Sequence, residues 1–276
     1  MSMTIRTNMA SIDAQRNLQQ TQLSLNSSMA KLSSGYRINS ASDDAAGLGI
    51  STKLEAQISS YGQANRNAND GLSVIQTTES ALNETSNILN RLRQLAMQSA
   101  SDGIGDTERG YVQTEAGQLS SEIDRIANVT QYNSTNLLAS PATGLDFQVG
   151  VNGTANDVIS FSTLDATTAS TGLNLAGMDL STKAGAVAAL STIDAAIQTV
   201  STDRAMLGAV GNRFQSAINN IQNFSEALTE ADSRIKDVDV AVETSNMARA
   251  NILQQAGVSV LAQANQTPQL ALKLLG

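Results

Sequence analysis

The sequence contains no cysteine, no histidine and no tryptophan. Without cysteine the chain forms no disulfide and no thiolate metal site, and without histidine it has no imidazole base and no Ser-His-Asp triad. A GxxxxGK[ST] phosphate loop is also missing, and an HExxH zinc motif is impossible without histidine. We therefore expect no catalytic residue, no cofactor and no metal site, and we expect that the protein is not an enzyme.

Aromatic residues make up only 3% of the chain, although 41% of its 276 residues are hydrophobic. This composition favours Ala, Leu and Ile seams between helices over a broad globular core or a deep ligand pocket. Proline occurs only at Pro141 and Pro268, so long spans are free of helix breakers. The net charge of −8 argues against nucleic-acid and anionic-membrane partners. The opening residues MSMTIRTNMA lack the apolar core of a secretory signal, and no run of about 18 apolar residues predicts membrane insertion.

A heptad pattern covers residues 207–242. Its apolar residues are spaced alternately by three and four positions: Leu207, Val210, Phe214, Ala217, Ile221, Phe224, Leu228, Ala231, Ile235, Val238 and Val242. The positions between them are largely polar, so one stripe alone is apolar. We expect one uninterrupted helix here, roughly 50 Å long at about 1.5 Å per residue. A helix of this kind is typically part of a rod, with its stripe covered by other helices.

Similar stripes predict further helices. Residues 5–34 form a helix whose apolar face is too sparse to be ordered without a partner. A second long helix covers about residues 64–101, and the Gly-rich loop of residues 102–106 ends it, caps a third helix and so forms an antiparallel hairpin. The chain beyond residue 242 has a denser apolar face and ends in a leucine-rich tip. We expect the two terminal segments to be complementary to one another or to other copies of the chain.

The apolar period changes to two after Pro141. Polar residues there alternate with Leu145, Phe147, Val149 and Val151. Asn152-Gly153 is a turn signal, and residues 158–161 return the chain, so we predict a β-hairpin. A loop-like acidic segment follows over residues 162–185, and residues 187–200 then begin the long returning helix.

The segment LSSGYRINSASDDAAGLGIS separates the first two helices. Gly35 is a natural helix stop, and Asp43 or Asp44 can cap the helix that follows. Adjacent carboxylates are weak evidence for a metal site when no histidine accompanies them, and a lone GxG is weak evidence for a phosphate loop. We interpret this segment as a polar turn with a helix cap.

Three long motifs resemble bacterial flagellin: LSSGYRINSASDDAAGLGIS, QANRNANDGLSVIQTTESALNE and SNMARANILQQAGVSVLAQANQTPQLALKLLG. The resemblance implies a mainly α fold with long heptad helices in a coiled-coil rod, a small β-hairpin region near residues 140–180, and terminal helices paired in an inner coiled coil. It implies an inner N-terminal helix and spoke over residues 1–44, a rod over 45–231 and an inner C-terminal helix over 232–276. The large variable outer domains of the family are missing here.

The resemblance also implies the function. Flagellin is the repeating subunit of the hollow, extracellular motility filament, and it leaves the cell unfolded through a type III export channel. We expect an export chaperone to bind residues 231–276 before secretion, and we expect filament cap and hook–filament junction proteins as later partners. The side chains that we expect to drive assembly are apolar and lie near both ends of the chain: Ile5, Met9, Ile12, Leu18, Leu25, Met29, Leu32, Ile252, Leu253, Val258, Val260 and Leu261.

Two host sensors of flagellin are further partners that the resemblance implies. The family motif LxRxxxL, which the flagellin-sensing Toll-like receptor recognises, matches Leu89, Arg91 and Leu95. Arg93 matches a second basic position, and Glu115 matches the acidic partner on the next helix. A cytosolic inflammasome sensor reads C-terminal leucines in the family, and these match Leu272, Leu274 and Leu275.

Two other classes of protein also contain long heptads. A helical hairpin of the chemoreceptor kind would lack the β-hairpin and would not need apolar residues near both ends. A flagellin-like hook–filament junction protein shares the terminal motifs and is the alternative that the sequence leaves open.

Overall fold

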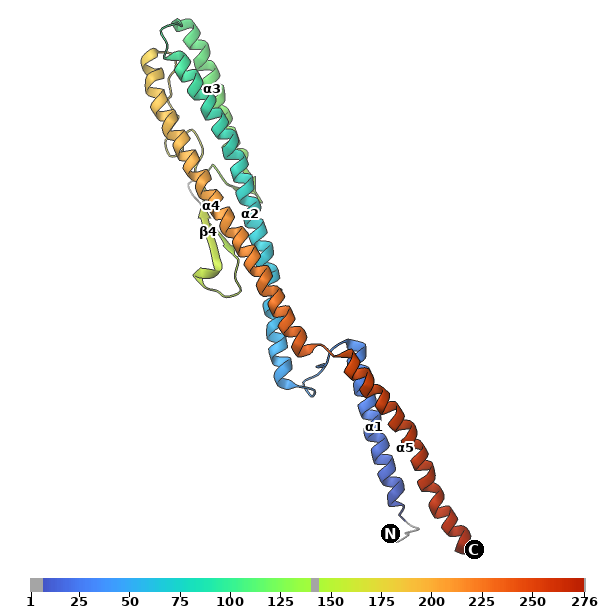
Figure 1. The fold of residues 1–276 in the computed structure, drawn as a ribbon. Helices are drawn as coiled ribbons and strands as arrows, with labels where there is room; N and C mark the ends of the chain where they lie inside the picture. The colour runs from blue at the N-terminus through green and yellow to red at the C-terminus, as the bar shows by residue number, and fades with distance from the viewer. Residues whose placement is uncertain (1–6, 140–143, 276) are drawn as a thin grey trace. The chain divides into compact units, whose positions relative to one another are not determined.

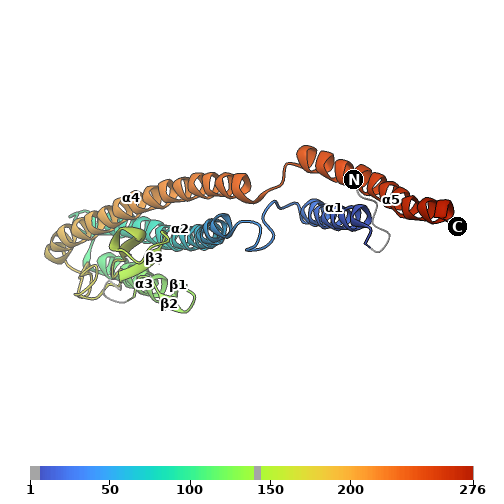
Figure 2. The same cartoon turned by 90° about the horizontal axis from the view of Figure 1, so that it is seen from below.

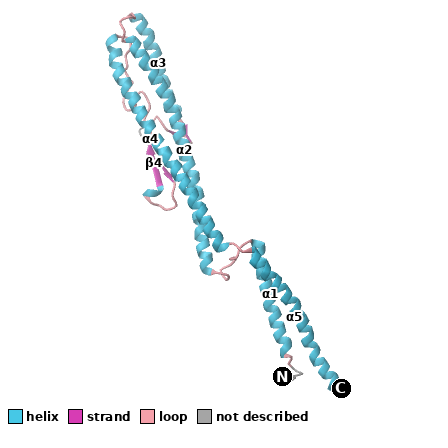
Figure 3. Cartoon of the chain, in the orientation of Figure 1, coloured by secondary structure: helices cyan, strands magenta, loops and turns pink. Residues whose placement is uncertain are grey.

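The computed structural model describes residues 7–139 and 144–275, and it describes side chains as far as Gln266 (Figure 1). Its elements, in chain order, are α1 (Met9–Ser34), α2 (Ala45–Ser99), α3 (Asp106–Val129), β1 (Gln131–Tyr132), β2 (Thr135–Asn136), β3 (Gly144–Gln148), a 3₁₀ helix (Ala155–Asp157), β4 (Val158–Ser162), α4 (Lys183–Lys236) and α5 (Val240–Leu275). Helices predominate (Figure 3), which confirms the predicted mainly α fold class.

The chain divides into two compact units. We call Met1–Gln57 together with Ala227–Gly276 the terminal unit, and Ile58–Glu226 the central unit. The helices α2 and α4 contribute residues to both. The division into three segments that the sequence suggests, with boundaries after residues 44 and 231, stays a prediction.

The helices α2, α3 and α4 lie alongside one another in the central unit (Figures 1 and 2). The heptad stripes form its core, and the residues buried to 1% exposure or less include Leu82, Leu89, Leu92, Leu95, Ala116, Ile123, Ile193, Leu207 and Phe214. The stripe of α4 is less covered further along, because Phe224 is 50% exposed. The heptad positions therefore identify the core of the central unit.

The predicted β-hairpin is confirmed. β3 and β4 pair antiparallel with Gly144 opposite Ser162 and Gln148 opposite Val158. Phe147 and Phe161 stack with their ring centroids 5.9 Å apart, and both meet the edge of Phe214 from α4, at 5.7 and 6.4 Å. Three of the four phenylalanines of the chain thus attach the hairpin to the core.

Gly71 of α2 is the point where α2 approaches Phe214. A Cβ atom at Gly71 would lie 2.6 Å from Phe214 Cζ and 3.2 Å from Phe147 Cδ1. We expect Gly71→Ala to lower the free energy of unfolding by about 1–3 kcal/mol in urea titrations, because it overpacks this aromatic cluster. In α3, Gly117→Ala is the control, because a Cβ there meets open space; it should stabilise by about 0.5–1 kcal/mol. A Gly71→Ala protein as stable as the unaltered chain would mean that Phe214 can move away.

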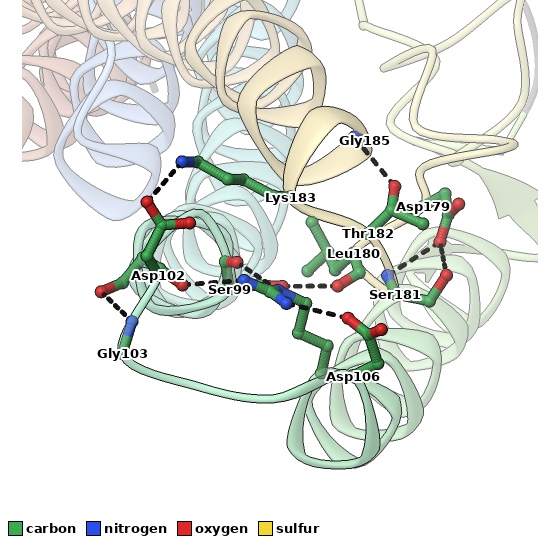
Figure 4. A network of polar contacts seen from close by, with 12 residues as sticks. Ser99, Asp102, Gly103, Asp106, Asp179, Leu180, Ser181, Thr182, Lys183 and Gly185 are labelled. Carbon is green, nitrogen blue, oxygen red and sulfur yellow. Dashed lines mark hydrogen bonds and ion pairs between the residues drawn. The ribbon is translucent and has the colours of Figure 1, made fainter.

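The loop between α2 and α3 is closed by a residue that the heptad pattern did not indicate. Arg109 is 7% exposed and donates to the backbone oxygens of Ser99 and Ser101 and to the Asp106 carboxylate, each at 2.9 Å. These bonds satisfy carbonyl groups at the end of α2. Figure 4 shows the surrounding polar contacts, including the 2.5 Å bond from Ser99 Oγ to the Leu180 oxygen.

The hairpin of α2 and α3 is confirmed, and the cap of α3 lies in the predicted loop, although no side chain there forms the capping hydrogen bond. Gly105 is the residue that precedes α3, and it has no side chain to cap the helix. Asp106 is the first residue of α3, where a negative charge is favourable beside the positive end of the helix dipole.

The expectation of one helix over residues 207–242 is wrong. α4 ends at Lys236 and α5 begins at Val240. Between them, the Val238 N–H donates to the Gly35 oxygen at 3.0 Å and the Arg37 N–H donates to the Lys236 oxygen at 2.6 Å. These long-range backbone bonds replace helix bonds, although neither proline nor glycine marks the break. Asp239 then caps α5, accepting from the N–H groups of Ala241 and Val242.

The start of α2 was also predicted too late. The helix begins at Ala45 rather than near residue 64, and Gly47, Gly49 and Gly62 lie within it. Asp44 provides the cap that the sequence suggested, because its Oδ1 accepts from the Gly47 N–H at 2.9 Å. The helical preference of the flanking residues therefore outweighs the three glycines.

One short hairpin was missed. β1 and β2 have two residues each, too few to show a period, and Asn133 and Ser134 between them have φ values of 47° and 65°. Such left-handed pairs form tight hairpin turns.

By length and composition alone, α4 could cross a membrane, although the sequence contains no run of about 18 apolar residues. Its Ala186, Ile193, Val200 and Leu207 are buried in the core of the central unit. These four positions are seven residues apart, so they form one stripe of α4 that packs into the core, and 28% of the most apolar stretch of the helix is buried.

Candidate functional site

The terminal helices α1 and α5 pair with one another, side by side in both Figure 1 and Figure 2. Polar contacts between described residues join them, among them Asn8 Nδ2 to the Ala264 oxygen at 2.9 Å, Ser11 Oγ to Asn265 Oδ1 at 2.8 Å, and Gln254 Nε2 to Gln22 Oε1 at 2.5 Å. Residue numbers rise along α1 as they fall along α5, so the pair is antiparallel. Directional bonds of this kind fix one register between the two helices.

The seam between α1 and α5 is narrow and contains mainly small side chains. Among the side chains that the structure describes, its buried residues are Ser11, Ala14, Leu25, Ser28 and Ala250. At Gly257 of α5, a Cβ atom would lie only 3.3 Å from Leu18 Cδ1. Small residues let the helix axes approach closely but bury little apolar area, so this pairing leaves most of the large apolar side chains unused.

Large apolar side chains cover the outer faces of the pair. Seven of the residues predicted for assembly are about half exposed or more: Met9 58%, Ile12 49%, Met29 55%, Ile252 66%, Leu253 52%, Val258 53% and Val260 59%. This many large apolar side chains exposed on one helix pair is typical of an interaction surface. We call these seven residues the outer apolar set.

The other predicted assembly residues have different surroundings. Leu25 is buried in the seam, while Leu18, Leu32 and Leu261 are partly covered. Ile5 lies outside the described residues. The sequence did not single out Leu23 or Val240, which are 57% and 59% exposed; both stand outside the regular stripe, which is why the spacing did not reveal them.

A groove of about 700 Å³ runs between α1 and α5. Leu23 and Leu253 contribute apolar surface to it, and Lys31, Glu243 and Arg249 contribute charges of both signs. A mixed apolar and charged groove along a helix pair suits a third helix better than a small molecule.

The connection between α1 and α2 is bonded to the break between α4 and α5. Tyr36 forms a β-bridge with Asp237, and Arg37 Nη2 donates to the Ile235 oxygen at 2.6 Å. Lys236 Nζ lies 4.4 Å from the Tyr36 ring centroid and pairs with Glu55, whose hydrogen bond raises the pKa of the lysine. The beginning of α5 is thereby held against the end of α1.

The residues matching the receptor motif lie in the central unit and do not all reach its surface. Arg91 on α2 pairs with Glu115 on α3 at 2.7 Å, and Arg93 pairs with Asp194 on α4 at 2.6 Å. Hydrogen bonding from Arg93 lowers the pKa of the Asp194 carboxyl. Leu89 and Leu95 are at most 1% exposed and belong to the core. The motif thus separates into two buried leucines and a surface group of three charged residues.

The C-terminal leucines Leu272, Leu274 and Leu275 belong to α5, but the structure does not describe their side chains.

The Asp43 carboxylate has a structural role in the turn before α2. It accepts hydrogen bonds from the Ser40 hydroxyl and from the N–H groups of Asn39 and Ser40, and these bonds lower the pKa of the carboxyl.

Two family models match the chain. Residues 5–143 match the bacterial flagellin N-terminal helical region, and residues 190–275 match the bacterial flagellin C-terminal helical region. A flagellin of Halalkalibacterium halodurans is 42% identical over 273 residues, which cover 99% of this chain and all of the relative. A flagellin of Bacillus subtilis is 40% identical, and a flagellar filament 33 kDa core protein of Treponema phagedenis is 39% identical; each alignment covers 99% of this chain and all of the relative.

Proposed function

The chain belongs to the bacterial flagellin family and is a structural subunit of the flagellar filament, not an enzyme, and we propose that its subunits join through the outer apolar set on α1 and α5. Identical flagellin subunits assemble into a filament, and this filament is extracellular.

The observation that carries the proposal is the contrast between the seam and the outer faces of the helix pair. The seam buries mainly small residues, whereas Ile252 and Val260 stay 66% and 59% exposed. If assembly buried on the order of 1,000 Å² of apolar surface per subunit, at about 25 cal/mol per Å² it would contribute roughly 25 kcal/mol before ordering costs. No single polar contact in the pair approaches that contribution.

We expect Ile252→Asp to prevent filament growth and leave the monomer as stable as before. Residue 252 is already largely in water, so the monomer loses little packing, while assembly would have to bury an unpaired carboxylate. The measurement is negative-stain microscopy of the purified protein after seeding with filament fragments, together with thermal unfolding of the monomer.

Val187→Asp is the matched control for that variant. Val187 is 54% exposed on α4 in the central unit, so the substitution has the same chemistry outside the terminal helices. It should still form filaments. Normal filaments from Ile252→Asp would contradict the proposal, as would equal loss from both variants. If the unaltered chain itself stays monomeric when seeded, a flagellin-like hook–filament junction protein becomes the better interpretation.

We propose that secretion and capping follow the family pattern. The described chain contains no disulfide to break before passage through a type III export channel. An export chaperone bound to residues 231–276 would cover the apolar face of α5 until secretion. Filament cap and hook–filament junction proteins would then meet the same terminal helices. Leu272, Leu274 and Leu275 remain the proposed contact of the cytosolic sensor.

We propose that the Toll-like receptor contacts the charged group of Arg91, Arg93 and Glu115. In this proposal Leu89 and Leu95 act indirectly, by packing α2 against its neighbours so that both arginines lie outward. The proposal is supported by the exposure of the charged side chains, which are all close to half exposed.

We expect Arg91→Ala to reduce receptor activation strongly while changing the free energy of unfolding by less than about 1 kcal/mol, since exposed ion pairs contribute little to stability. Reporter cells exposed to monomer give the readout. Arg125→Ala is the control, because Arg125 also pairs with an acidic residue on the surface, Glu122 at 2.7 Å, without belonging to the charged group. Absence of a response to the unaltered monomer at micromolar concentration would contradict the proposal.

A further inference from the structure

The turn at the end of the β3–β4 hairpin contains the dipeptide Asn152-Gly153, and its surroundings indicate a chemical modification. We propose that Asn152 deamidates spontaneously and that it is the principal site in the chain at which an asparagine becomes an aspartate or an isoaspartate. The reaction needs only water. It would add a negative charge to the hairpin and is separate from the assembly role of the terminal helices.

The local structure leaves both reacting groups free. Asn152 and Gly153 are exposed, and a Cβ atom built at Gly153 meets nothing within 4 Å. Gln148 Nε2 donates to the main-chain oxygens of Gly150 and Asn152, at 3.0 and 2.9 Å, so Gln148 holds the turn without engaging the Asn152 side chain or the Gly153 N–H. Within the described residues, neither the Asn152 side-chain amide nor the Gly153 N–H has a hydrogen-bond partner.

The chemistry follows from these two groups. The Gly153 backbone nitrogen loses its proton to water or hydroxide and attacks Asn152 Cγ, forming a new N–Cγ bond. The bond from Cγ to the side-chain nitrogen breaks, and the nitrogen leaves as ammonia, which gives a five-membered cyclic imide. Water then adds to one of the two imide carbonyls and opens the ring to aspartate or isoaspartate. Glycine favours the ring closure because no side chain hinders its nitrogen or restricts its backbone.

The Asp102-Gly103 pair could form the same imide, but the structure protects it. The Gly103 N–H, which would have to attack, donates to Ser101 Oγ at 3.2 Å. Lys183 Nζ holds the Asp102 carboxylate at 2.7 Å (Figure 4), and this hydrogen bond lowers the pKa of the carboxyl. An ionised carboxylate is a poor electrophile, so both partners of the ring closure are disabled.

Two further pairs are protected in other ways. Asp70-Gly71 lies within α2, where helical geometry keeps the Gly71 nitrogen away from the side chain before it and Phe214 crowds the glycine. Asn133-Ser134 lies in the exposed β1–β2 turn, but Ser134 has a Cβ atom that hinders attack. Asn152 alone among these sites combines an amide, a following glycine and free reacting groups.

Modification would change the hairpin where it meets α2. A groove of about 360 Å³ lies there, lined by Asn67 of α2 and by Gln148, Asn152 and Gly153 of the hairpin. Isoaspartate lengthens the backbone by one methylene group, which displaces the oxygens that Gln148 holds. The new carboxylate also adds to the negative charge of Asp157 in the same turn.

The test is to incubate the purified full-length monomer at mildly alkaline pH and to follow Asn152 by peptide mapping and mass spectrometry, with an isoaspartyl methyltransferase to label isoaspartate. We expect the Asn152 peptide to be modified several-fold faster than the Asn133 peptide, with isoaspartate among the products. Gly153→Ala should slow the reaction at Asn152 several-fold and leave circular dichroism unchanged, because a Cβ there has open space. Asn152→Gln should all but abolish it, because glutamine would have to close a six-membered imide, which forms much more slowly than the five-membered one.

A synthetic peptide of residues 148–158 separates the effect of the fold from that of the dipeptide. If the peptide deamidates while Asn152 in the folded protein stays intact, the fold protects the site and the proposal is wrong. Faster modification at Asn133 or at Asp102 than at Asn152 would overturn it equally. Modification of Gly153→Ala at the unaltered rate would show that the glycine has no role.

Discussion

A chain lacking residues 1–35 should form no filaments, while α2, α3 and α4 of the central unit stay folded. The deletion removes the whole of α1 and the Gly35 oxygen that holds Val238. α5 then loses its partner in the seam, and the part of the outer apolar set on α1 disappears with the helix. Most helical stability in proteins comes from packing against a partner, so we expect α5 without α1 to become largely disordered.

Two measurements on the truncated chain distinguish an assembly defect from general unfolding. Circular dichroism should show a cooperative thermal transition close to that of the full chain, because the buried core of Leu82, Leu89 and Phe214 is unchanged. Seeds made from unaltered filaments should not be elongated. Filaments grown from the truncated chain would show that α1 is dispensable, and our account of assembly would then fail.

Replacing Phe214 by alanine should destabilise the central unit by about 3–5 kcal/mol, a large part of the stability of a typical domain. Phe214 is fully buried and meets both Phe147 and Phe161 edge to face. Its removal leaves a cavity beneath the hairpin and takes away the surface on which β3 and β4 rest. Since a two-stranded hairpin is marginal by itself, we expect β3 and β4 to become accessible to proteases before α2 and α4 unfold.

Phe224→Ala is the matched control. Phe224 belongs to the same stripe of α4 but is 50% exposed and stacks on Tyr61 at 5.9 Å. Its loss should cost much less free energy in urea titrations, and the hairpin should stay protected. Equal destabilisation by the two substitutions would mean that the aromatic cluster at Phe214 has no special part in holding the hairpin.

The sequence predicted the elements that repeat a pattern and missed those that depend on a distant partner. Heptad spacing located the core residues of α2, α3 and α4, and a period of two located β3 and β4. Heptad spacing did not predict the break at residues 237–239, because the hydrogen bonds that end α4 are formed with Gly35 and Arg37, about 200 positions earlier. Arg109 was missed for the same kind of reason, since a buried arginine that caps another helix has no periodic signature.

The candidate interface was predicted in composition but not in geometry. Spacing selected apolar residues of α1 and α5 without showing which would face the partner helix and which the solvent. Leu25 is buried whereas Met29, four positions later, is 55% exposed. The seam uses Ser11 and Ser28, and no apolar pattern can reveal a seam built partly from serine. Likewise, the receptor motif gave no indication that Leu89 and Leu95 belong to the core.

The pairing of α1 with α5 also has a consequence for the order of folding. The contact of Asn8 with Ala264 joins residues 256 positions apart, whereas the central unit is one continuous segment of chain. Closing a loop of that length costs more entropy than closing the short connections of the α2–α3 hairpin, and distant contacts form slowly. We expect the central unit to fold first and to bring the two ends within reach. The outer apolar set then forms a surface on paired helices only at the last step. By that time most of the chain is folded, so few unfolded segments remain that could bind a neighbouring subunit wrongly.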